Sequence, residues 1–121
     1  VLCLSTTLSR PYHRVRSSAE SDVNKSQLYD ALAPSANPAK PRGQWDRFVI
    51  TCKGPKVTVS INGKQVVTAN LDQWTTGNRN PDGSRNKFKI ALKDLPRKGH
   101  IGFQDHGQDV WFRNVYLKKL D

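Results

Sequence analysis

The sequence predicts a small all-β domain, built as an antiparallel sandwich or barrel. Three observations favour this fold class. Short runs of alternating apolar and polar residues lie close together between 47 and 69, an Asn-Gly pair joins two of them, and no segment has a long apolar period of 3.6 residues. The length of 121 residues suits one domain, because two packed cores would be cramped in so short a chain.

The first third of the chain carries weak structural signals. Residues 1–26 are polar, rich in Ser and Arg and without a clear period, so we expect a poorly ordered leader ahead of a β-sandwich over 27–121. Its apolar start is at most a remnant of a signal peptide, which needs about 7–15 apolar residues. Gln27–Leu32 fits a short strand or one helical turn, and the prolines of 33–44 predict an extended loop.

The next segment predicts a three-stranded antiparallel meander. Strands are expected over Arg47–Lys53, Lys56–Ile61 and Lys64–Ala69. Phe48, Ile50 and Cys52 share one face of the first strand, apolar and polar residues alternate strictly along the second, and the third returns after the hairpin turn. Gly54-Pro55 marks the first turn. Asn62-Gly63 marks the second and is a strong hairpin sequence, since both central residues of a type I′ turn need a positive φ.

The elements after the meander are marked less sharply. Residues 75–87 predict a long polar loop, and loops of this length are often functional. A short strand is expected over Phe88–Leu92. Two further strands are expected over His100–His106 and Val110–Lys118, on either side of Gly107.

The two cysteines, Cys3 and Cys52, are too few for a disulfide scaffold or a Cys-rich zinc site. Alternation places Cys52 on the same strand face as Phe48 and Ile50, so we expect it to pack as a small buried hydrophobe. No Cys/His cluster has the spacing of metal ligands.

The chain is strongly basic, with 20 Lys and Arg against 10 Asp and Glu and a formal net charge of +10. This excess fits either a polyanion partner or a solvated surface. The densest stretch, Arg85–Lys98, holds one aromatic residue, so it lacks the interleaved aromatics of a single-strand stacking platform. We therefore interpret the charge as surface and expect no nucleic-acid partner. No apolar run approaches the ~18 residues of a membrane span.

One stretch near the carboxyl end combines the residue types of a catalytic face. If Ile101 and Phe103 point into the core, alternation sends Gly102, Gln104 and His106 to the opposite face. The side chains of Gln104 and His106 would then lie about 6–7 Å apart along the strand. Gly102 would leave room for a ligand to approach the backbone.

The last predicted strand adds to this face. With Phe112 inward, Trp111 and Arg113 point outward, and two adjacent strands would gather both beside Gln104 and His106. Such a set suits a sugar. The indole would cover the C–H face of the ring, the amide and guanidinium would donate to hydroxyls, and the imidazole would transfer protons.

Each of these residues also has a structural interpretation. A lone histidine near a strand end is more often a satisfied surface residue than a catalyst. Trp111 would belong to the core if Asn114 marks a bulge that shifts the register. Arg113 could pair with Asp105 or Asp109 as a surface salt bridge of little worth.

Several stretches resemble one bacterial carbohydrate-active family. They are Leu28-Tyr29-Asp30, Gly43-Gln44-Trp45, Asn80-Pro81-Asp82-Gly83, Gly99 to Gly107 (GHIGFQDHG) and Val110 to Val115 (VWFRNV). From about Gln27 to Leu120, the sequence resembles the 3-keto-disaccharide hydrolase family. The members of this family are also described as 3-keto-glucoside 1,2-lyase/3-keto-glucal hydratase domains. The QDHG and WFRN pair is the more specific part of this resemblance.

The resemblance implies an antiparallel concanavalin A-like jelly-roll sandwich with a carbohydrate substrate in its concave face. It implies cleavage of 3-keto-glycosides by elimination and hydration. His106 is then the candidate base or metal-holding imidazole, and Gln104 and Arg113 are candidate contacts to the sugar or enolate. Substrate contacts are also expected from Trp111, Asp105 and Tyr29. The resemblance allows a divalent cation as Lewis acid and implies no other cofactor.

The resemblance also implies a periplasmic or extracellular bacterial protein. Residues 1–26 do not resemble the N-terminal half of such domains, so we expect a sandwich that is incomplete at its N-terminus. Open sheet edges would favour association between copies of the chain. A non-catalytic carbohydrate-binding sandwich is therefore the alternative function, and polyanion binding, suggested by the net charge, is the third hypothesis.

Overall fold

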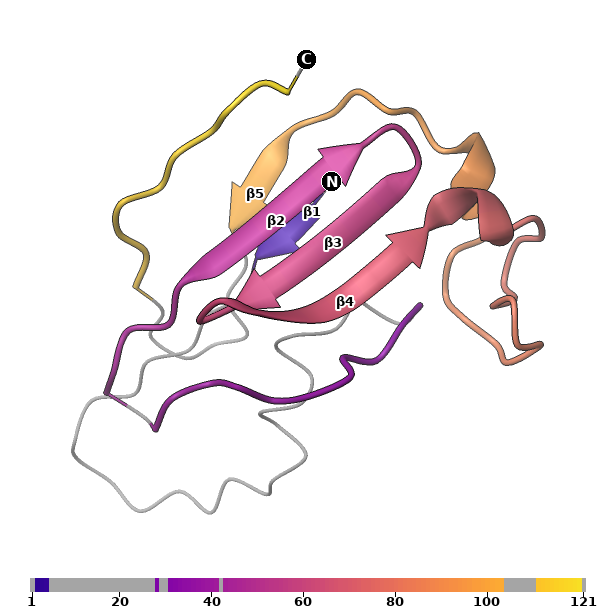
Figure 1. The fold of residues 1–121 in the computed structure, drawn as a ribbon. Helices are drawn as coiled ribbons and strands as arrows, with labels where there is room; N and C mark the ends of the chain where they lie inside the picture. Colours follow the sequence, from indigo (N-terminus) through magenta and orange to yellow (C-terminus); the bar gives the residue numbers. More distant parts are fainter. Residues whose placement is uncertain (1, 5–27, 29–30, 42, 104–110, 121) are drawn as a thin grey trace.

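The computed structural model describes residues 2–4, 28, 31–41, 43–103 and 111–120. Its elements in chain order are β1 (Leu2–Leu4), β2 (Phe48–Lys53), β3 (Lys56–Ile61), β4 (Lys64–Asn70), the 3-10 turns η2 (Leu71–Gln73) and η3 (Leu92–Asp94), and β5 (Ile101–Phe103) (Figure 1). Apart from the two short 3-10 turns, the regular elements of the described part are all strands, which confirms the all-β class. Within it, no helix has the length and apolar character needed to cross a membrane.

The predicted meander is confirmed, with β2, β3 and β4 lying side by side in that order (Figure 1). Both junctions are antiparallel. The turn between β3 and β4 has positive φ at both central residues, 51° at Asn62 and 83° at Gly63, as a type I′ turn requires. Gly54, in the turn between β2 and β3, also has a positive φ of 56°.

A β-bulge in β4 shapes the edge of this sheet. Val59 pairs with Val67, but the next pair joins Ser60 to Gln65, so Val66 has no partner in the ladder. The extra residue lets two consecutive valines be buried, each with 2% of its surface exposed. The Val66 carbonyl accepts hydrogen bonds from the backbone N–H and hydroxyl of Ser35, at 2.8 and 3.2 Å. The bulge therefore fixes the proline-rich loop against β4.

The core consists of two buried clusters that share two leucines. The first is centred on Ala31, Ala69, Trp74 and Leu92. The second is centred on Val59, Ile61, Val66 and Val67. Leu28 and Leu32 pack against both, at the ends of a turn in which the Leu32 N–H donates to the Leu28 carbonyl at 3.0 Å. The Leu28 N–H also donates to the Leu32 carbonyl at 3.0 Å, so these two residues form an isolated antiparallel bridge and not the helical turn considered for Gln27–Leu32. Residues 27, 29 and 30 of that segment lie outside the described residues.

A second sheet pairs β1 with β5 in parallel, with Leu2 opposite Ile101 and Leu4 opposite Phe103. This pairing differs from the antiparallel arrangement expected throughout. It joins a segment within the predicted leader to a segment near the carboxyl end, and no local turn signal could announce such a long-range pair.

Two expected strands are wrong. Phe88–Leu92 is not a strand, because the chain bends there and enters η3. Its apolar residues separate accordingly, with Phe88 packed against the first cluster, Leu92 buried, and Ile90 59% exposed. The described residues 111–118 of the last predicted strand form no ladder either.

Two predicted burials are also wrong. Cys52 is exposed near the end of the edge strand β2, although neighbouring atoms desolvate its thiol enough to raise its pKa. Ile101 and Phe103 were expected in the core but are 51% and 47% exposed. β5 borders only β1 among the described strands, so no described sheet covers these two side chains.

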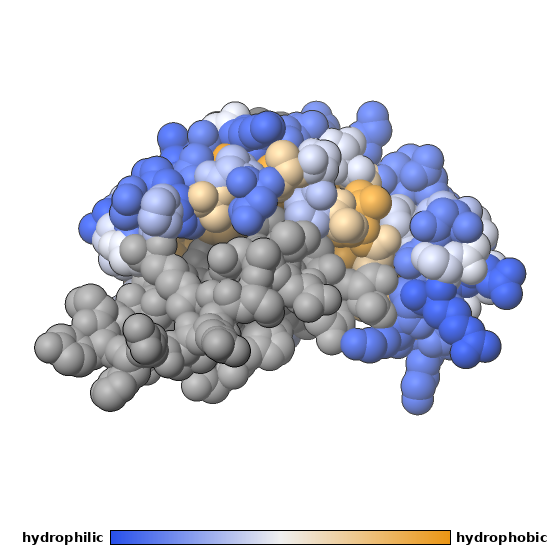
Figure 2. All heavy atoms as spheres, turned by 90° about the horizontal axis from the view of Figure 1, so that it is seen from below, coloured by the Kyte–Doolittle hydropathy of each residue, from blue (hydrophilic) through white to orange (hydrophobic). Residues whose placement is uncertain are grey.

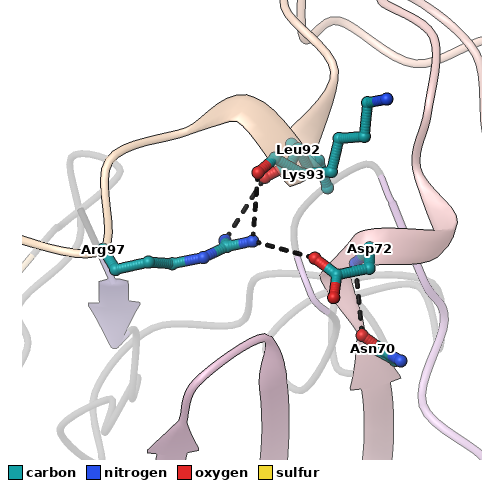
Figure 3. A network of polar contacts seen from close by, with 5 residues as sticks. All are labelled: Asn70, Asp72, Leu92, Lys93 and Arg97. Atoms are coloured by element: carbon teal, nitrogen blue, oxygen red, sulfur yellow. Dashed lines mark hydrogen bonds and ion pairs between the residues drawn. The ribbon is translucent and has the colours of Figure 1, made fainter.

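The turn η2, which follows β4, is tied to η3 by Arg97 (Figure 3). Its guanidinium donates to the Asp72 carboxylate at 3.3 Å and to the carbonyls of Leu92 and Lys93 at 3.3 and 3.2 Å. Asn70 caps the start of η2 by accepting from the Asp72 N–H at 3.2 Å. Arg97, one of the cations of the densest basic stretch, therefore has a structural role at the base of the 75–87 loop.

Candidate functional site

One predicted site residue, Arg113, lies over the ring of Trp45. The guanidinium carbon is 3.9 Å from the ring centroid, well within the range of a cation–π interaction. Both residues are exposed, with 37% of the Trp45 surface accessible. The interaction restricts where the cation sits while leaving guanidinium N–H groups available to a ligand, because no described residue accepts a hydrogen bond from them.

Asn62 organises the loop segment that carries Trp45. Its Nδ2 donates to the Asp46 carboxylate at 2.7 Å and to the Pro38 carbonyl at 3.0 Å. The Lys40 ammonium donates to the Trp45 carbonyl at 3.1 Å, and the Lys40 N–H donates to the same Asp46 carboxylate oxygen at 3.0 Å. The hairpin turn, the proline-rich loop and the approach to β2 thus hold one another in place.

A second aromatic contact joins β5 to the C-terminal segment. The rings of Phe103 and Phe112 have centroids 4.5 Å apart and planes inclined by 48°. The two segments therefore meet through side chains, whereas the sequence interpretation supposed adjacent strands of one sheet. Trp111 and Arg113 flank Phe112 in the chain, and Trp111 is 37% exposed.

The other predicted site residues lie outside the described part of the chain. These are Gln104, Asp105, His106 and Tyr29. The structure thus gathers Arg113 with Trp45 and brings Phe103 to Phe112.

The structure distinguishes between the structural alternatives for this segment. Trp111 is exposed and does not belong to the buried core, although Asn114 does have an irregular backbone with a φ of 51°. Arg113 forms no ion pair with any described residue and instead contacts Trp45. The carboxylates considered as its partners, Asp105 and Asp109, lie outside the described residues.

Sequence reasoning did not single out Trp45 or Asn62 as site residues. Trp45 was noted only within a resembling stretch, and Asn62 only as a turn residue. An isolated tryptophan directly before a strand was the available signal, because such a residue is large, apolar and placed where a loop can present it.

The described residues contain no group of three or more His, Cys, Asp or Glu side chains placed to hold a metal ion. The described side chains that this site offers a ligand include the guanidinium of Arg113 and the exposed indoles of Trp45 and Trp111. These can donate hydrogen bonds and cover apolar faces, but they cannot remove a proton at neutral pH.

Comparison with known proteins decides the family. Residues 10–118 match the 3-keto-alpha-glucoside-1,2-lyase-like domain. The chain belongs to this family. The matched range begins upstream of Gln27, where the resemblance was placed from the sequence, and it includes Trp45, Trp111 and Arg113.

Two relatives of the chain are informative. A 3-keto-disaccharide hydrolase of Bacteroides thetaiotaomicron is 33% identical over 110 residues, which cover 84% of this chain. A crystal structure described as a glycosyl hydrolase of Parabacteroides distasonis is 32% identical, with a TM-score of 0.54 over 57% of this chain. The second likeness agrees with the predicted all-β sandwich. The chain spans 38% of the first relative and 36% of the second.

Proposed function

We propose that this chain provides a substrate-binding and catalytic face of a domain that cleaves 3-keto-glycosides by elimination and hydration. The observation that carries the proposal is the Arg113 guanidinium, fixed 3.9 Å over Trp45 and close in sequence to His106. Membership of the 3-keto-alpha-glucoside-1,2-lyase-like family supports the reaction type. Arg113 is a donor with restricted position and unused N–H groups, which is what a developing enolate oxygen needs.

The proposed reaction begins at C2 of the sugar. The ketone at C3 acidifies the C2 proton, and the imidazole of His106 removes it, so the C2–H electron pair forms the enolate of C3. The enolate then expels the aglycone oxygen from C1, which leaves a C1–C2 double bond conjugated to the C3 ketone. Neutral imidazole suits the first step because its ordinary pKa lies close to physiological pH.

Hydration completes the proposed cycle. Water adds at C1 of the unsaturated ketone and gives its remaining proton to the aglycone alkoxide released in the first half. The protonated histidine exchanges with solvent between the two halves and then delivers a solvent-derived proton to C2. Arg113 and Gln104 donate hydrogen bonds to the C3 oxygen while it carries negative charge, in both halves of the reaction. The products are the released aglycone and a free 3-keto sugar.

Substrate contacts are assigned to residues around this centre. The exposed indole of Trp111 offers an apolar face to the sugar ring. Asp105 and Tyr29 are proposed to bind ring hydroxyls, since a carboxylate accepts and a phenol both donates and accepts hydrogen bonds.

A chromogenic 3-keto-glucoside tests the proposal. Release of the aglycone is measured with the unaltered chain, with H106Q and with the matched control H100Q, after subtraction of the uncatalysed rate. Because general base catalysis typically contributes about 10²–10⁴-fold, H106Q is expected to lose at least about a hundredfold in rate. His100 is exposed and serves as a control for the loss of a histidine six positions away. Equal rates for H106Q and the unaltered chain would remove His106 from the mechanism.

Sugar binding without turnover is the second candidate function. The exposure of Trp111 and the unused donors of Arg113 favour it, because an aromatic face beside hydrogen-bond donors is sufficient to bind a saccharide. Calorimetric titration with 3-keto-glucosides and their parent glucosides distinguishes sugar binding without turnover from enzymatic cleavage. Heat of binding with no product in the same cell supports a binding module, and product release supports the enzyme.

We further propose that the protein acts in the periplasm or outside the cell, where glycosides from the environment are met. Membership of the family supports this location only because of the glycosides that it implies as substrates. Fractionation of the native bacterium followed by immunodetection would test it, and recovery in the cytoplasmic fraction alone would contradict it.

A further inference from the structure

A polar recess lies at the opposite end of the meander from Trp45 and Arg113. Trp45 precedes the start of β2, next to the Asn62-Gly63 turn, whereas the recess begins after the end of β4. It has a volume of about 320 Å³ and is lined by Gln73, Thr75, Thr76, Arg79, Asn80, Pro81 and Gly83. The meander strands are six or seven residues long, so the two places are roughly 20 Å apart.

The loop around this recess has a fixed framework. The Asn80 side-chain oxygen accepts from Trp74 Nε1 and from Asn86 Nδ2, both at 2.8 Å. Asn80 Nδ2 donates to the Ser84 hydroxyl at 3.0 Å. Trp74 and Asn86 are buried, with 3% and 8% of their surfaces exposed. Asn80 is therefore committed to the framework, and the recess is built before any ligand arrives.

Further backbone contacts close the loop beneath this framework. The Asn78 N–H donates to the Phe88 carbonyl at 2.6 Å, and the Asn86 N–H donates to the Asn78 carbonyl at 3.1 Å. Gly77 lies so close to the Lys89 backbone that a Cβ there would overlap the Lys89 carbonyl oxygen. Such a packed loop presents its outward side chains from a defined backbone, which reduces the entropy lost on binding.

Four side chains of the lining remain available to a ligand. Gln73, Thr75, Thr76 and Arg79 are exposed, and none has a side-chain hydrogen bond to another described residue. Together they offer an amide, two hydroxyls and a guanidinium. Amides and hydroxyls match the hydroxyl groups of a sugar, and a guanidinium binds a carboxylate with two parallel hydrogen bonds.

The charge around the recess favours an anionic ligand. Arg79, Arg85, Lys87 and Lys89 lie on the same loop, and the carboxylate of Asp82 already accepts from the Ser84 N–H and hydroxyl at 2.9 and 2.6 Å. Figure 2 shows that the projecting lobe on the right, where this loop lies, is mostly hydrophilic. The lobe thus combines a positive potential with neutral polar groups, and it lacks the exposed aromatic face that neutral sugars favour.

We propose that this recess is a second ligand site, which binds an acidic saccharide unit of the uronic acid class. Arg79 binds the carboxylate, and Gln73, Thr75 and Thr76 bind the ring hydroxyls. The site is separate from the face around Trp45 and Arg113, so it would hold an acidic glycan near the catalytic face without taking part in the chemistry. The proposal does not depend on the proposed enzymatic activity.

Binding of three probes to the whole chain tests the proposal. Calorimetry and amide chemical shifts are recorded with trigalacturonate, with neutral maltotriose and with inorganic sulfate. Trigalacturonate is expected to bind and to shift the amides of residues 73–83. Maltotriose and sulfate are expected to bind much more weakly, because maltotriose has no carboxylate and sulfate has no sugar hydroxyls. Equal affinity for maltotriose, binding of sulfate as tight as that of trigalacturonate, or no trigalacturonate binding would each overturn the proposal.

Two arginine variants locate the site. R79Q is expected to weaken trigalacturonate binding by at least about tenfold, since a charge-assisted hydrogen bond is worth about 1.5–3 kcal/mol. R85Q is the matched control, because Arg85 is exposed on the same loop and opposite Arg79 in an isolated bridge but does not line the recess. T76V removes a lining hydroxyl at nearly constant volume and should weaken binding as well. Equal losses for R79Q and R85Q would indicate non-specific attraction and would overturn the proposal.

Discussion

Arg113 lies 3.9 Å over the indole of Trp45, and this contact connects the C-terminal segment with the loop that leads into the meander. The two residues are far apart in the sequence, and neither belongs to a strand. The contact therefore depends on Asn62 and the proline-rich loop on one side and on the Phe103–Phe112 contact on the other.

Removing the Arg113–Trp45 contact should lower stability modestly. R113Q and W45L are each expected to lower the free energy of unfolding, and the double variant should lose less than the sum of the two. The coupling should be about 0.5–1 kcal/mol, the range of an exposed cation–π interaction. Urea unfolding of the four proteins in a double-mutant cycle provides the measurement, and strict additivity would contradict the contact.

Asn62 should be sensitive to the loss of its side chain even where its backbone conformation is retained. N62G keeps the positive φ but removes the hydrogen bonds to Arg47, Asp46 and Pro38. We expect a loss of roughly 1–2 kcal/mol in the free energy of unfolding. N62A should lose more, because an alanine in the left-handed region adds about 1 kcal/mol of strain. Unchanged stability of N62G in urea unfolding would show that the network does not hold the loop.

Gly77 should not tolerate a side chain. In G77A the Cβ would meet the carbonyl oxygen of Lys89, which is backbone and cannot rotate away. We expect a destabilisation of about 1–3 kcal/mol, as in other overpacked sites. G102A is the matched control, because a Cβ at Gly102 has no heavy atom within 4 Å. Thermal melting of both variants tests this, and equal melting temperatures would be inconsistent with the close approach.

The pKa of Asp82 should lie below its ordinary value because its carboxylate accepts two hydrogen bonds from Ser84. The bond from the hydroxyl has the larger effect and the bond from the N–H the smaller. S84A should raise this pKa towards the ordinary value. A lowered native pKa stabilises the folded loop above the ordinary pKa, and that contribution is lost as the pH falls through the native pKa. Carboxyl carbon shifts in an NMR titration provide the measurement, and identical titrations of S84A and the unaltered chain would refute the assignment.

The meander could be predicted from sequence because its information is local. Alternation sets the faces of the strands, and Asn62-Gly63 sets the turn and the register. The bulge at Val66 was missed, although two consecutive valines in an otherwise alternating strand are the signal that such a bulge leaves. Phe88 was misassigned to a strand because a short apolar run cannot by itself distinguish a strand from a bend that inserts one ring into the core.

The candidate site could be predicted only in part. Arg113 and Trp111 were expected on an exposed surface and are exposed, although the segment forms no strand and only Phe112 between them is partly buried. The inward placement of Ile101 and Phe103 was wrong, since alternation gives two faces but does not say which one is covered. The partner of Arg113 could not be found, because a contact with Trp45 depends on how three loops pack.

The reaction course can be tested directly by cleavage of a 3-keto-glucoside in D₂O, with the deuterium content at C2 of the released sugar measured by mass spectrometry and NMR at short times. The free 3-keto sugar, incubated without protein, corrects for spontaneous exchange. Elimination followed by hydration predicts that solvent deuterium is incorporated at C2 in each turnover, and that H106Q loses this incorporation together with aglycone release. Cleavage that retains the original C2 hydrogen would contradict the elimination and the role assigned to His106.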